Sequence, residues 1–381
     1  MSARLGSYIV KNYGDESVRA FVPPSLPPDP PVNLQPLQVL LEEANLALGR
    51  LDGLTTILPD PSLFIYFYVR KEAVLSSQIE GTQSSLSDLL LYESDEMPGV
   101  PTDDVLEVSN YVAALNHGMA RLREGFPLSN RLLREVHGKL LAQGRGSEKQ
   151  PGEFRTSQNW IGGTRPGNAA FVPPPAENVI DLMSSLEMFL HHSSPDLPVL
   201  VKAALAHVQF ETIHPFLDGN GRVGRLLITL LLCVAGVIRE PILYLSLYLK
   251  TNRQQYYDLL DRVRSSGDWE AWLEFFLDGV RTTSDQAAQT AHRLLAIGDE
   301  DQRRIETLGR PAAMVLRLHQ LMRRKLIIGI PTAAKDLGIS PPTATNAMQH
   351  LRELGIVVET TGRPRHRLFV YSRYMAVLNQ E

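Results

Sequence analysis

The sequence is almost without cysteine, since Cys233 is the single one among 381 residues. One cysteine can form neither an intramolecular disulfide nor a Cys-based zinc site. The first residues, MSARLGSYIVKNYG, also lack the long apolar segment and the small-residue cleavage site of a secretory signal. These absences favour a protein of the reducing cytoplasm.

Long hydrophobic runs are missing as well. The longest, residues 226–238, has 13 residues and lies between Arg225 and Arg239. At about 1.5 Å per helical residue it falls well short of the roughly 30 Å of a bilayer's hydrocarbon core. We therefore expect no membrane span.

The composition that is present is ordinary for a folded, soluble protein, with 44% hydrophobic and 21% charged residues. With about 100 to 200 residues per domain, the length predicts two or three domains. The net charge is −4. From Arg303 onward, however, 13 Lys and Arg face 5 Asp and Glu, which gives +8 and leaves −4 − 8 = −12 for the preceding part. This asymmetry indicates two units with different electrostatic roles.

Most of the chain has a helical pattern. Residues 22–36 contain seven prolines and predict an extended arm instead. Apolar residues at helical spacing then predict a mainly helical fold with the following helices: 37–54, 63–81, 103–125, 129–143, and a further series from 176 to about Thr290. Between them, residues 151–175 combine β-prone residues with a Gly-rich turn, which predicts a short β-hairpin.

The C-terminal part has its own order of elements. Three helices are expected over residues 312–324, 331–339 and 341–355, followed by two strands around a basic turn within residues 357–372. This order is typical of a winged helix-turn-helix, which binds DNA or serves as a protein-interaction unit. For duplex DNA, the residues expected to contact the phosphates or the minor groove are Arg363, Arg365 and Arg367 in the turn.

The segment with the clearest chemistry is HPFLDGNGRVGR, His214–Arg225. Gly219 and Gly221 permit a backbone that presents successive N–H groups to an anion at a helix start, which suits a polyphosphate. Arg222 and Arg225 are three apart on the following helix and can point to one phosphate chain. Asp218 can hold a divalent cation there, and His214, with an expected near-neutral pKa, can act as a base on a hydroxyl.

Other phosphate and metal motifs are absent from the sequence. There is no Walker A pattern and no H-E-x-x-H. His207 and His214 are seven apart and could share a helix face, but no third residue has the spacing of a metal ligand. A zinc site is not expected.

The twelve-residue segment resembles the signature of Fic domains, H-P-F-x-[DE]-G-N-G-R-x-x-R, at every defined position. The resemblance implies transfer of AMP from ATP to a Ser, Thr or Tyr hydroxyl of a protein, assisted by Mg²⁺. It makes His214 the base and Asp218 the Mg²⁺ ligand. It also implies a nucleotide-binding set in the loop and the following helix: Gly219, Asn220, Gly221, Arg222, Val223, Gly224 and Arg225.

Two further segments extend the resemblance. GEFRTSQNWIGG is similar to the hairpin flap with which Fic proteins align the target, and its residues 159–162 would lie nearest the nucleotide, with Ile161 and Gly162 as contacts. YLKTNRQQYYDLL resembles the region around the adenine, which suggests Asn252 and Tyr257. Paired tyrosines on a helix can equally belong to a core.

Upstream, Ser76-Ser77-Gln78-Ile79-Glu80-Gly81 resembles the inhibitory motif of the family, [ST]-x-x-x-E-[GN]. Ser76 and Glu80 share a helix face, and Gly81 is expected to leave room for close approach. By resemblance, Glu80 bonded to Arg225 would occupy the place of the γ-phosphate and restrain the enzyme.

The expected domains are an arm and inhibitory region over residues 1–115, a Fic core over 116–298 and a winged helix-turn-helix over 299–381. The leading hypothesis is a self-inhibited adenylyltransferase that modifies proteins, including itself. A second is deAMPylation, with Glu80 orienting a water, and a third is a DNA-binding regulator whose Fic fold senses a nucleotide. A homodimer is compatible with each.

Overall fold

The computed structural model describes residues 4–13, 16–57, 61–93, 102–192, 197–362 and 367–379. Its helices and strands are, in chain order, β1 (Ser7–Tyr13), β2 (Glu16–Val22), η1 (Gln35–Leu37), α1 (Gln38–Ile57), α2 (Pro61–Ile79), α3 (Leu86–Glu93), α4 (Thr102–Arg123), α5 (Asn130–Leu140), η2 (Pro166–Asn168), η3 (Ala176–Asn178), α6 (Val179–His191), α7 (Val199–Ile213), α8 (Asn220–Val234), α9 (Ser246–Thr251), α10 (Arg253–Ser266), α11 (Trp269–Glu306), α12 (Ala312–Lys325), β3 (Ile327–Gly329), α13 (Ile330–Leu337), α14 (Pro341–Glu353), β4 (Val357–Glu359), β5 (Leu368–Tyr371) and α15 (Ser372–Leu378).

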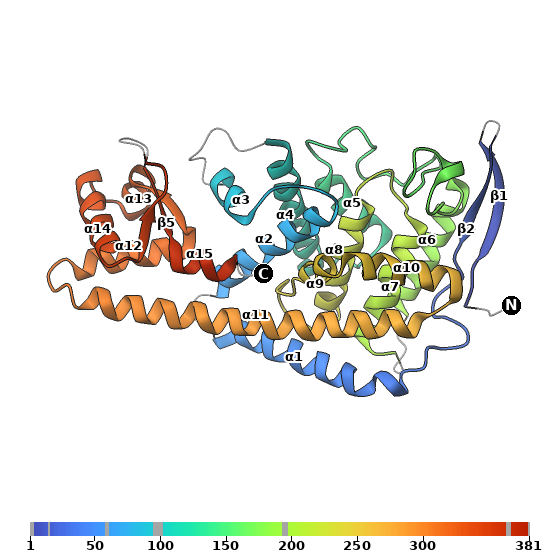
Figure 1. Cartoon of the computed structure of the whole chain (residues 1–381), viewed down its shortest axis with the longest axis horizontal. Coiled ribbons are helices and arrows are strands. Elements are labelled where there is room, and N and C mark those ends of the chain that lie inside the picture. Colours follow the sequence, from blue (N-terminus) through green and yellow to red (C-terminus); the bar gives the residue numbers. More distant parts are fainter. Residues whose placement is uncertain are drawn as a thin grey trace.

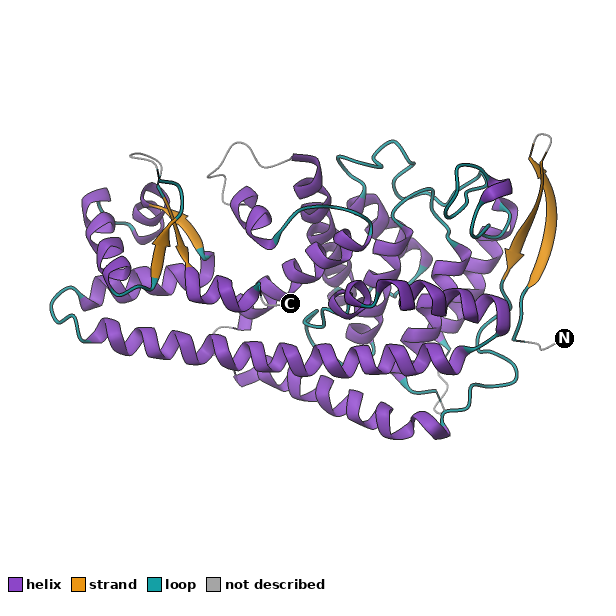
Figure 2. Ribbon diagram, viewed as in Figure 1, coloured by secondary structure: helices purple, strands orange, loops and turns teal. Residues whose placement is uncertain are grey.

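The fold is mainly helical, as the sequence predicts, and α11 is the longest of the described helices. This helix has 38 residues and runs along one side of the molecule, next to α1 (Figure 1). Helices α2 to α10, which lie between α1 and α11 in the sequence, form most of the larger body. The strands are confined to two small sheets near opposite ends (Figure 2).

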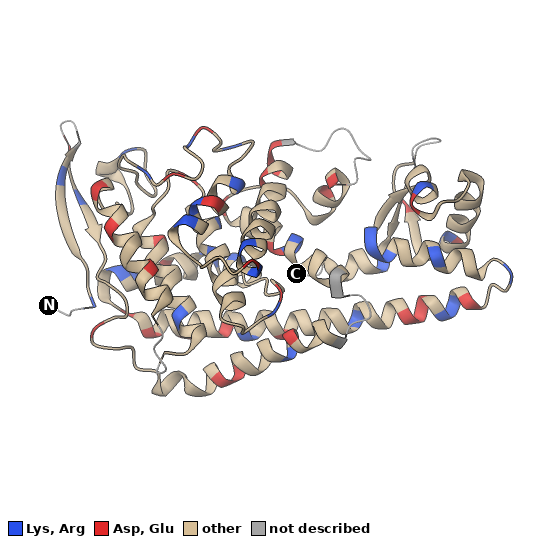
Figure 3. Cartoon of the chain, turned by 180° about the vertical axis from the view of Figure 1, so that it is seen from behind, with Lys and Arg blue, Asp and Glu red and all other residues tan. Residues whose placement is uncertain are grey.

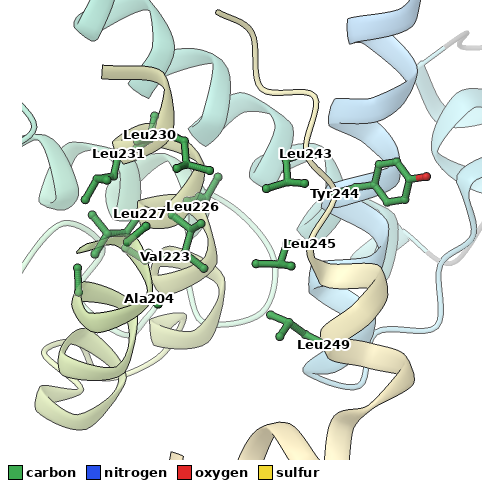
Figure 4. Close-up of a cluster of buried hydrophobic side chains, with 14 of the residues drawn as sticks. Ala204, Val223, Leu226, Leu227, Leu230, Leu231, Leu243, Tyr244, Leu245 and Leu249 are labelled. Carbon is green, nitrogen blue, oxygen red and sulfur yellow. The ribbon is translucent and has the colours of Figure 1, made fainter. Parts of the chain in front are cut away.

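Helix α8 lies in the middle of the larger body, which explains its apolar sequence. Val223, Leu226, Leu227 and Leu230 point into a cluster that also contains Ala204 of α7 (Figure 4). A helix that is apolar on nearly all sides is a buried core helix when it is too short to span a bilayer. Among the helices that the structure describes, none combines the length and the apolar character needed to cross a membrane.

An N-terminal β-hairpin is an element that the sequence analysis did not predict. Strands β1 and β2 pair antiparallel with Tyr8 opposite Phe21, and the N–H of Phe21 donates to the carbonyl of Val172 at 2.9 Å. The N-terminal hairpin therefore bonds to the edge of residues 151–175, the segment for which the sequence analysis predicts a short hairpin. The proline arm follows and crosses α7, where Nε2 of Gln209 donates to the carbonyl of Pro24 at 2.8 Å.

The hairpin expected over residues 151–175 is reduced to one antiparallel bridge, Ile161 with Phe171. The bridge cannot extend into two strands, because Gly162 and Gly163 follow it with φ of 68° and 73° and Pro173 ends the returning segment. We call residues 159–172 the flap.

The C-terminal region consists of α12 to α15 with a three-stranded sheet of order β3-β5-β4. The expected three helices and two strands are present, and β3 is an additional short strand. Its apolar core also includes Phe67 of α2 and Leu86 and Leu90 of α3. The Lys and Arg positions of this region can be followed in Figure 3.

The helical series expected to end near Thr290 in fact continues to Glu306. Gly298 lies inside α11, and a Cβ there would lie 2.8 Å from the hydroxyl of Tyr374 and 2.9 Å from the guanidinium of Arg323. The glycine thus permits close packing of the C-terminal region. Both expected domain boundaries, after residues 115 and 298, fall inside helices and stay predictions.

Candidate active site

The candidate site is the loop between α7 and α8. Helix α7 ends at Ile213, and His214 turns the chain with a left-handed φ of 51°. Gly219 has a φ of 76° and precedes the first turn of α8. The backbone N–H groups of that turn are the unpaired donors of a helix start, which favours a bound anion.

Amide side chains fix the shape of this loop. Asn220 both donates to the carbonyl and accepts from the N–H of Phe216, each at 2.8 Å. Asn159 of the flap donates to the same carbonyl at 2.9 Å. The side chain of Asn220 therefore holds the loop, and its backbone N–H is the group it can offer to a phosphate.

Arg155 is a loop-holding residue that the sequence analysis missed. It is 2% exposed, and it donates to the carbonyls of His214 at 2.9 Å and Pro174 at 2.6 Å. These bonds tie the flap's two ends to the residue expected to act as base. In the sequence, a single arginine that follows Phe154 has no pattern around it that would indicate such a role.

His137 of α5 supports the loop from the other side and was also missed. Its ring stacks on Phe216 with centroids 3.7 Å apart. Nδ1 accepts from the N–H of Gly152 at 2.8 Å, so the proton lies on Nε2, which donates to the carbonyl of Asp218 at 3.1 Å. Burial lowers the pKa of His137 to about 4, which keeps this neutral tautomer.

The pKa of His214 is lower than the near-neutral value that the sequence analysis predicts. Burial, followed by the positive charges of Arg155 and Arg264, lowers the pKa of His214 to about 4. The imidazole is therefore neutral at physiological pH and has a nitrogen free to accept a proton.

The segment that was compared with the inhibitory motif, residues 76–81, lies directly on Arg225. Nε of Arg225 donates to Oγ of Ser76 at 2.7 Å, and Nη2 donates to the carbonyl of Ser76 at 3.0 Å and to Oε1 of Glu80 at 2.7 Å. Burial raises the pKa of Glu80, but Arg225 and then Arg222 and His214 outweigh burial and hold this pKa below its usual range. Glu80 is therefore a carboxylate paired with the last arginine of the motif.

Gly221 and Gly81 are each required to be glycine, but for different structural reasons. A Cβ on Gly221 would lie 2.2 Å from Oε1 of Glu80, so the carboxylate reaches the first turn of α8 only because this residue is glycine. Gly81, in contrast, has open space around it and a φ of 100°. The expectation that Gly81 leaves room is thus wrong, since its backbone conformation is what requires glycine.

Arg222 faces two carboxylates. Its side chain is 3% exposed, with Nη1 at 3.5 Å from Oε2 of Glu107 and Nη2 at 3.8 Å from Oδ1 of Asp218. Its Nε is buried without a hydrogen-bond partner among the described residues. A buried donor left unpaired is a position that a ligand oxygen can satisfy.

The remaining nucleotide residues fall into two groups. Val223 is buried in the core, and Gly224 packs against the buried Glu211, whose Oε1 would lie 2.3 Å from an added Cβ. Asn252 precedes α10 and donates to the carbonyl of Tyr248 at 3.0 Å, while the side chain of Tyr257 is 40% exposed. Burial, followed by the negative charge of Glu80, raises the pKa of Tyr257.

The other predicted residues lie elsewhere. Ile161 and Gly162 are in the flap, where both N–H and C=O of Ile161 pair with Phe171. Arg363 and Arg365 lie outside the described residues, and the guanidinium of Arg367 is 5.6 Å from the ring centre of Phe369. In the described ranges no three His, Cys, Asp or Glu side chains are grouped as metal ligands.

Comparison with known proteins agrees with this geometry. Residues 38–120 match the sequence profile described as Fic/DOC family N-terminal, and residues 127–232 match that of the Fic/DOC family. The chain is 34% identical over 212 residues to a protein adenylyltransferase Fic of Aedes aegypti, and 32% identical over 211 residues to one of Drosophila ananassae. Each alignment covers 54% of this chain and 39% of the relative, so the chain spans about two fifths of the length of these relatives.

Solved structures show the same fold. A Fic family protein from Desulfovibrio desulfuricans G20 has a TM-score of 0.59 at 21% identity and covers 90% of this chain and 97% of its own. A Fic domain containing signaling protein from Bacteroides thetaiotaomicron has a TM-score of 0.51 at 19% identity, covering 66% of this chain and 95% of its own. With the motif loop, its glycines and the upstream carboxylate in place, the chain contains a Fic domain of the Fic/DOC family over residues 127–232, preceded by the N-terminal region of that family over residues 38–120.

Proposed function

We propose that the protein is a self-inhibited adenylyltransferase that transfers AMP from ATP to a Ser, Thr or Tyr hydroxyl of a protein, including its own chain. The proposal rests on one observation. A carboxylate oxygen of Glu80 lies against Gly221 in the first turn of α8 and 2.7 Å from Nη2 of Arg225, where a helix start would otherwise bind phosphate. The relatives named as adenylyltransferases support the reaction class.

In this mechanism His214 acts on the acceptor. Its neutral imidazole takes the proton of the hydroxyl while the hydroxyl oxygen forms a bond to the α-phosphorus of ATP. The bond from the α-phosphorus to the bridging oxygen breaks, and pyrophosphate leaves. Arg222 and Arg225 bind the outer phosphates, and the unpartnered Nε of Arg222 supports this assignment.

Asp218 fits the role of a Mg²⁺ ligand. Its side chain is 30% exposed, and Oδ1 accepts from the N–H of Gly219 at 2.6 Å, which leaves Oδ2 available. Mg²⁺ is usually held by one or two carboxylates together with substrate phosphates, so a single aspartate is sufficient. When bound, the ion neutralises charge that develops on the phosphates.

Transfer of label from ATP tests the proposal. With Mg²⁺ and the full chain, label from α-labelled ATP becomes covalent and label from γ-labelled ATP does not. Glu80→Gly frees Arg225 for the γ-phosphate and raises incorporation by about 10- to 100-fold, the range for a lost hydrogen bond between charged groups. Arg225→Ala in that background cancels the gain. Covalent γ label would indicate phosphoryl transfer instead, and equal incorporation by wild type and Glu80→Gly would exclude self-inhibition.

A second candidate is removal of AMP from a modified protein. Oε1 of Glu80 bonds to Arg225, whereas Oε2 has no hydrogen bond within the part of the chain that the structure describes. That oxygen is available to orient a water. We expect hydrolysis of an AMPylated protein to be lost in Glu80→Gly if this is the activity, the opposite of the effect on transfer.

A third candidate assigns duplex DNA binding to the C-terminal region as a winged helix-turn-helix. Helix α14 is capped by Ser340, whose hydroxyl accepts from the N–H of Thr343, and packs an apolar face with Ala347 and Leu351. Thr343, Asn346 and Gln349 lie on the exposed side at helical spacing. Such a polar face, in a region with a charge of +8, suits the major groove.

A further inference from the structure

The segment that follows Glu80 is bonded to α4. The hydroxyl of Thr82 donates to Oε2 of Glu107 at 2.9 Å, and the N–H of Gln83 donates to Oδ2 of Asp104 at 2.7 Å. Thr82 is 4% exposed and Glu107 is 3% exposed. The bond between them is therefore shielded from water, where a hydrogen bond to a carboxylate is strong.

The same carboxylate faces the phosphate-binding arginines. Oε2 of Glu107 is 3.5 Å from Nη1 of Arg222, and Oε1 is 4.0 Å from Nε of the exposed Arg145. Glu107 thus contacts the inhibitory segment and the first arginine of the motif at once. Glu80 contacts the second arginine directly.

Glu80 lies in the turn that closes α2, between the helix and the bonds to α4. Helix α2 ends at Ile79, so Glu80 lies just beyond the regular helical bonds. Gly81 has a φ of 100° with open space around it. The N–H groups of Glu80, Gly81 and Thr82 donate to carbonyls of the last turn of α2 at 3.0, 3.1 and 3.2 Å and close the helix end. The side chain of Thr82 is the group that ties this closing turn to α4.

We propose that Thr82 and Glu107 are positioning residues that hold Glu80 on Arg225, and that Glu107 links this hold to the phosphate-binding state of Arg222. The proposal rests on the self-inhibited transfer proposed above. A phosphate that draws Arg222 away from Glu107 changes the partners of the carboxylate that anchors Thr82. Because such coupling is reciprocal, release of the segment in turn changes the affinity of the site for nucleotide.

Thr82→Val in the full chain is the direct test, because it removes the hydroxyl and keeps the shape. AMP transfer from α-labelled ATP should rise by about 10-fold, at the lower end of the range for a hydrogen bond to a charged acceptor. Thr82→Ser, which keeps the hydroxyl, should remain near wild type. The matched control is Thr283→Val, a buried threonine of α11 whose hydroxyl bonds to the carbonyl of Gly279 at 2.7 Å. It should leave transfer unchanged.

A double mutant separates positioning from a general effect on structure. If Thr82 acts through Glu80, Thr82→Val added to Glu80→Gly gives no further increase. An equal increase in both backgrounds would overturn the proposal, as would no increase in wild type. Glu107→Gln keeps an oxygen that can accept from Thr82, so it should raise transfer less than Thr82→Val does, and it should tighten binding of ADP because Arg222 loses a competing negative charge.

Hydrogen exchange keeps the inference testable if Glu80 proves not to inhibit. Exchange of the amides of residues 79–84 should become faster in Thr82→Val and stay slow in Thr82→Ser and Thr283→Val. If Glu80→Gly leaves transfer unchanged, the hypothesis of self-inhibition is overturned. Unchanged hydrogen exchange in Thr82→Val would separately overturn the proposal that Thr82 anchors residues 79–84. Faster exchange with wild-type transfer, in a protein that responds to Glu80→Gly, would overturn the link to activity.

Discussion

Two contacts between a carboxylate and an arginine join distant parts of this molecule, and they are built differently. In the core, Glu80 has one bonded oxygen, and its side chain is 34% exposed. In the C-terminal region, Asp301 of α11 is 0% exposed and accepts from the hydroxyl of Tyr371 at 2.6 Å, from Arg373 at 2.9 Å and from Arg304 at 3.2 Å. The first carboxylate lies beyond a helix end and the second lies within a helix.

The difference in burial means that the carboxylate of Glu80 can give up its arginine to another anion, whereas that of Asp301 cannot. In the proposed mechanism a phosphate replaces Glu80, because the carboxylate regains water when it leaves. Asp301 has no such alternative, since removing its partners would leave a buried charge. The core contact therefore suits regulation, and the C-terminal contact suits permanent attachment of that region to α11.

The largest expected effect separates chemistry from folding. His214→Ala should lower AMP transfer by about 10²- to 10⁴-fold, the usual cost of losing a general base. Nucleotide binding and the unfolding midpoint should remain close to wild type, because the imidazole faces the acceptor hydroxyl. Transfer is measured with α-labelled ATP in the Glu80→Gly background, and ADP binding by calorimetry is the control. Transfer equal to that of the parent would remove His214 from the mechanism.

Asp301→Ala should have the opposite profile. It leaves the buried hydroxyl of Tyr371 without the carboxylate to which it donates, and the loss of a buried acceptor costs about 1 to 3 kcal/mol of folding free energy. Urea denaturation of the full chain should show this loss, whereas AMP transfer per folded molecule below the transition should be unchanged. A normal stability would show that Asp301 does not anchor the region.

Acid should weaken the C-terminal contact before the core contact. Nε2 of His319 lies 3.1 Å from the hydroxyl of Tyr371, and burial lowers the pKa of His319 to about 4. Its contribution to stability is complete above an unfolded pKa of about 6.5 and is lost as pH falls through about 4, up to about 3 kcal/mol. The pKa of Glu80 is held below its usual range, so its pairing with Arg225 persists at pH 5. His319→Gln should therefore lose less stability between pH 7 and pH 4.5 than wild type, as measured by urea denaturation.

The smallest expected effect concerns the opposite charges of the two regions. Full-length protein should bind random duplex DNA more weakly as salt rises, and replacing Arg363, Arg365 and Arg367 with alanine should lower the affinity. The log-log salt slope should become shallower by about 0.9 for each phosphate that the variant no longer neutralises. Fluorescence anisotropy measures both, with Arg50→Ala and Arg131→Ala in the core as the control. Absence of binding at low salt would favour a protein-interaction role.

The sequence predicted the parts of the site that are adjacent along the chain. HPFLDGNGRVGR contains its own turn, helix start and arginines, so local rules were sufficient for the loop, and Ser76 and Glu80 share a face by spacing alone. Glu107, His137 and Arg155 could not be found in this way. Each acts through a partner at least 59 residues away, and such pairings depend on helix packing that periodicity does not specify.

The N-terminal hairpin has a consequence for the order in which the chain folds. Two strands alone are marginally stable in water, and β2 gains its additional backbone bond from Val172, about 150 residues later in the sequence. Glu16 also accepts from the N–H of Gly167 at 3.2 Å. Closing so long a loop is entropically costly, so the hairpin acquires lasting order only after the flap has formed. The hairpin is synthesised before the flap and is thus among the later parts of this region to reach its final structure.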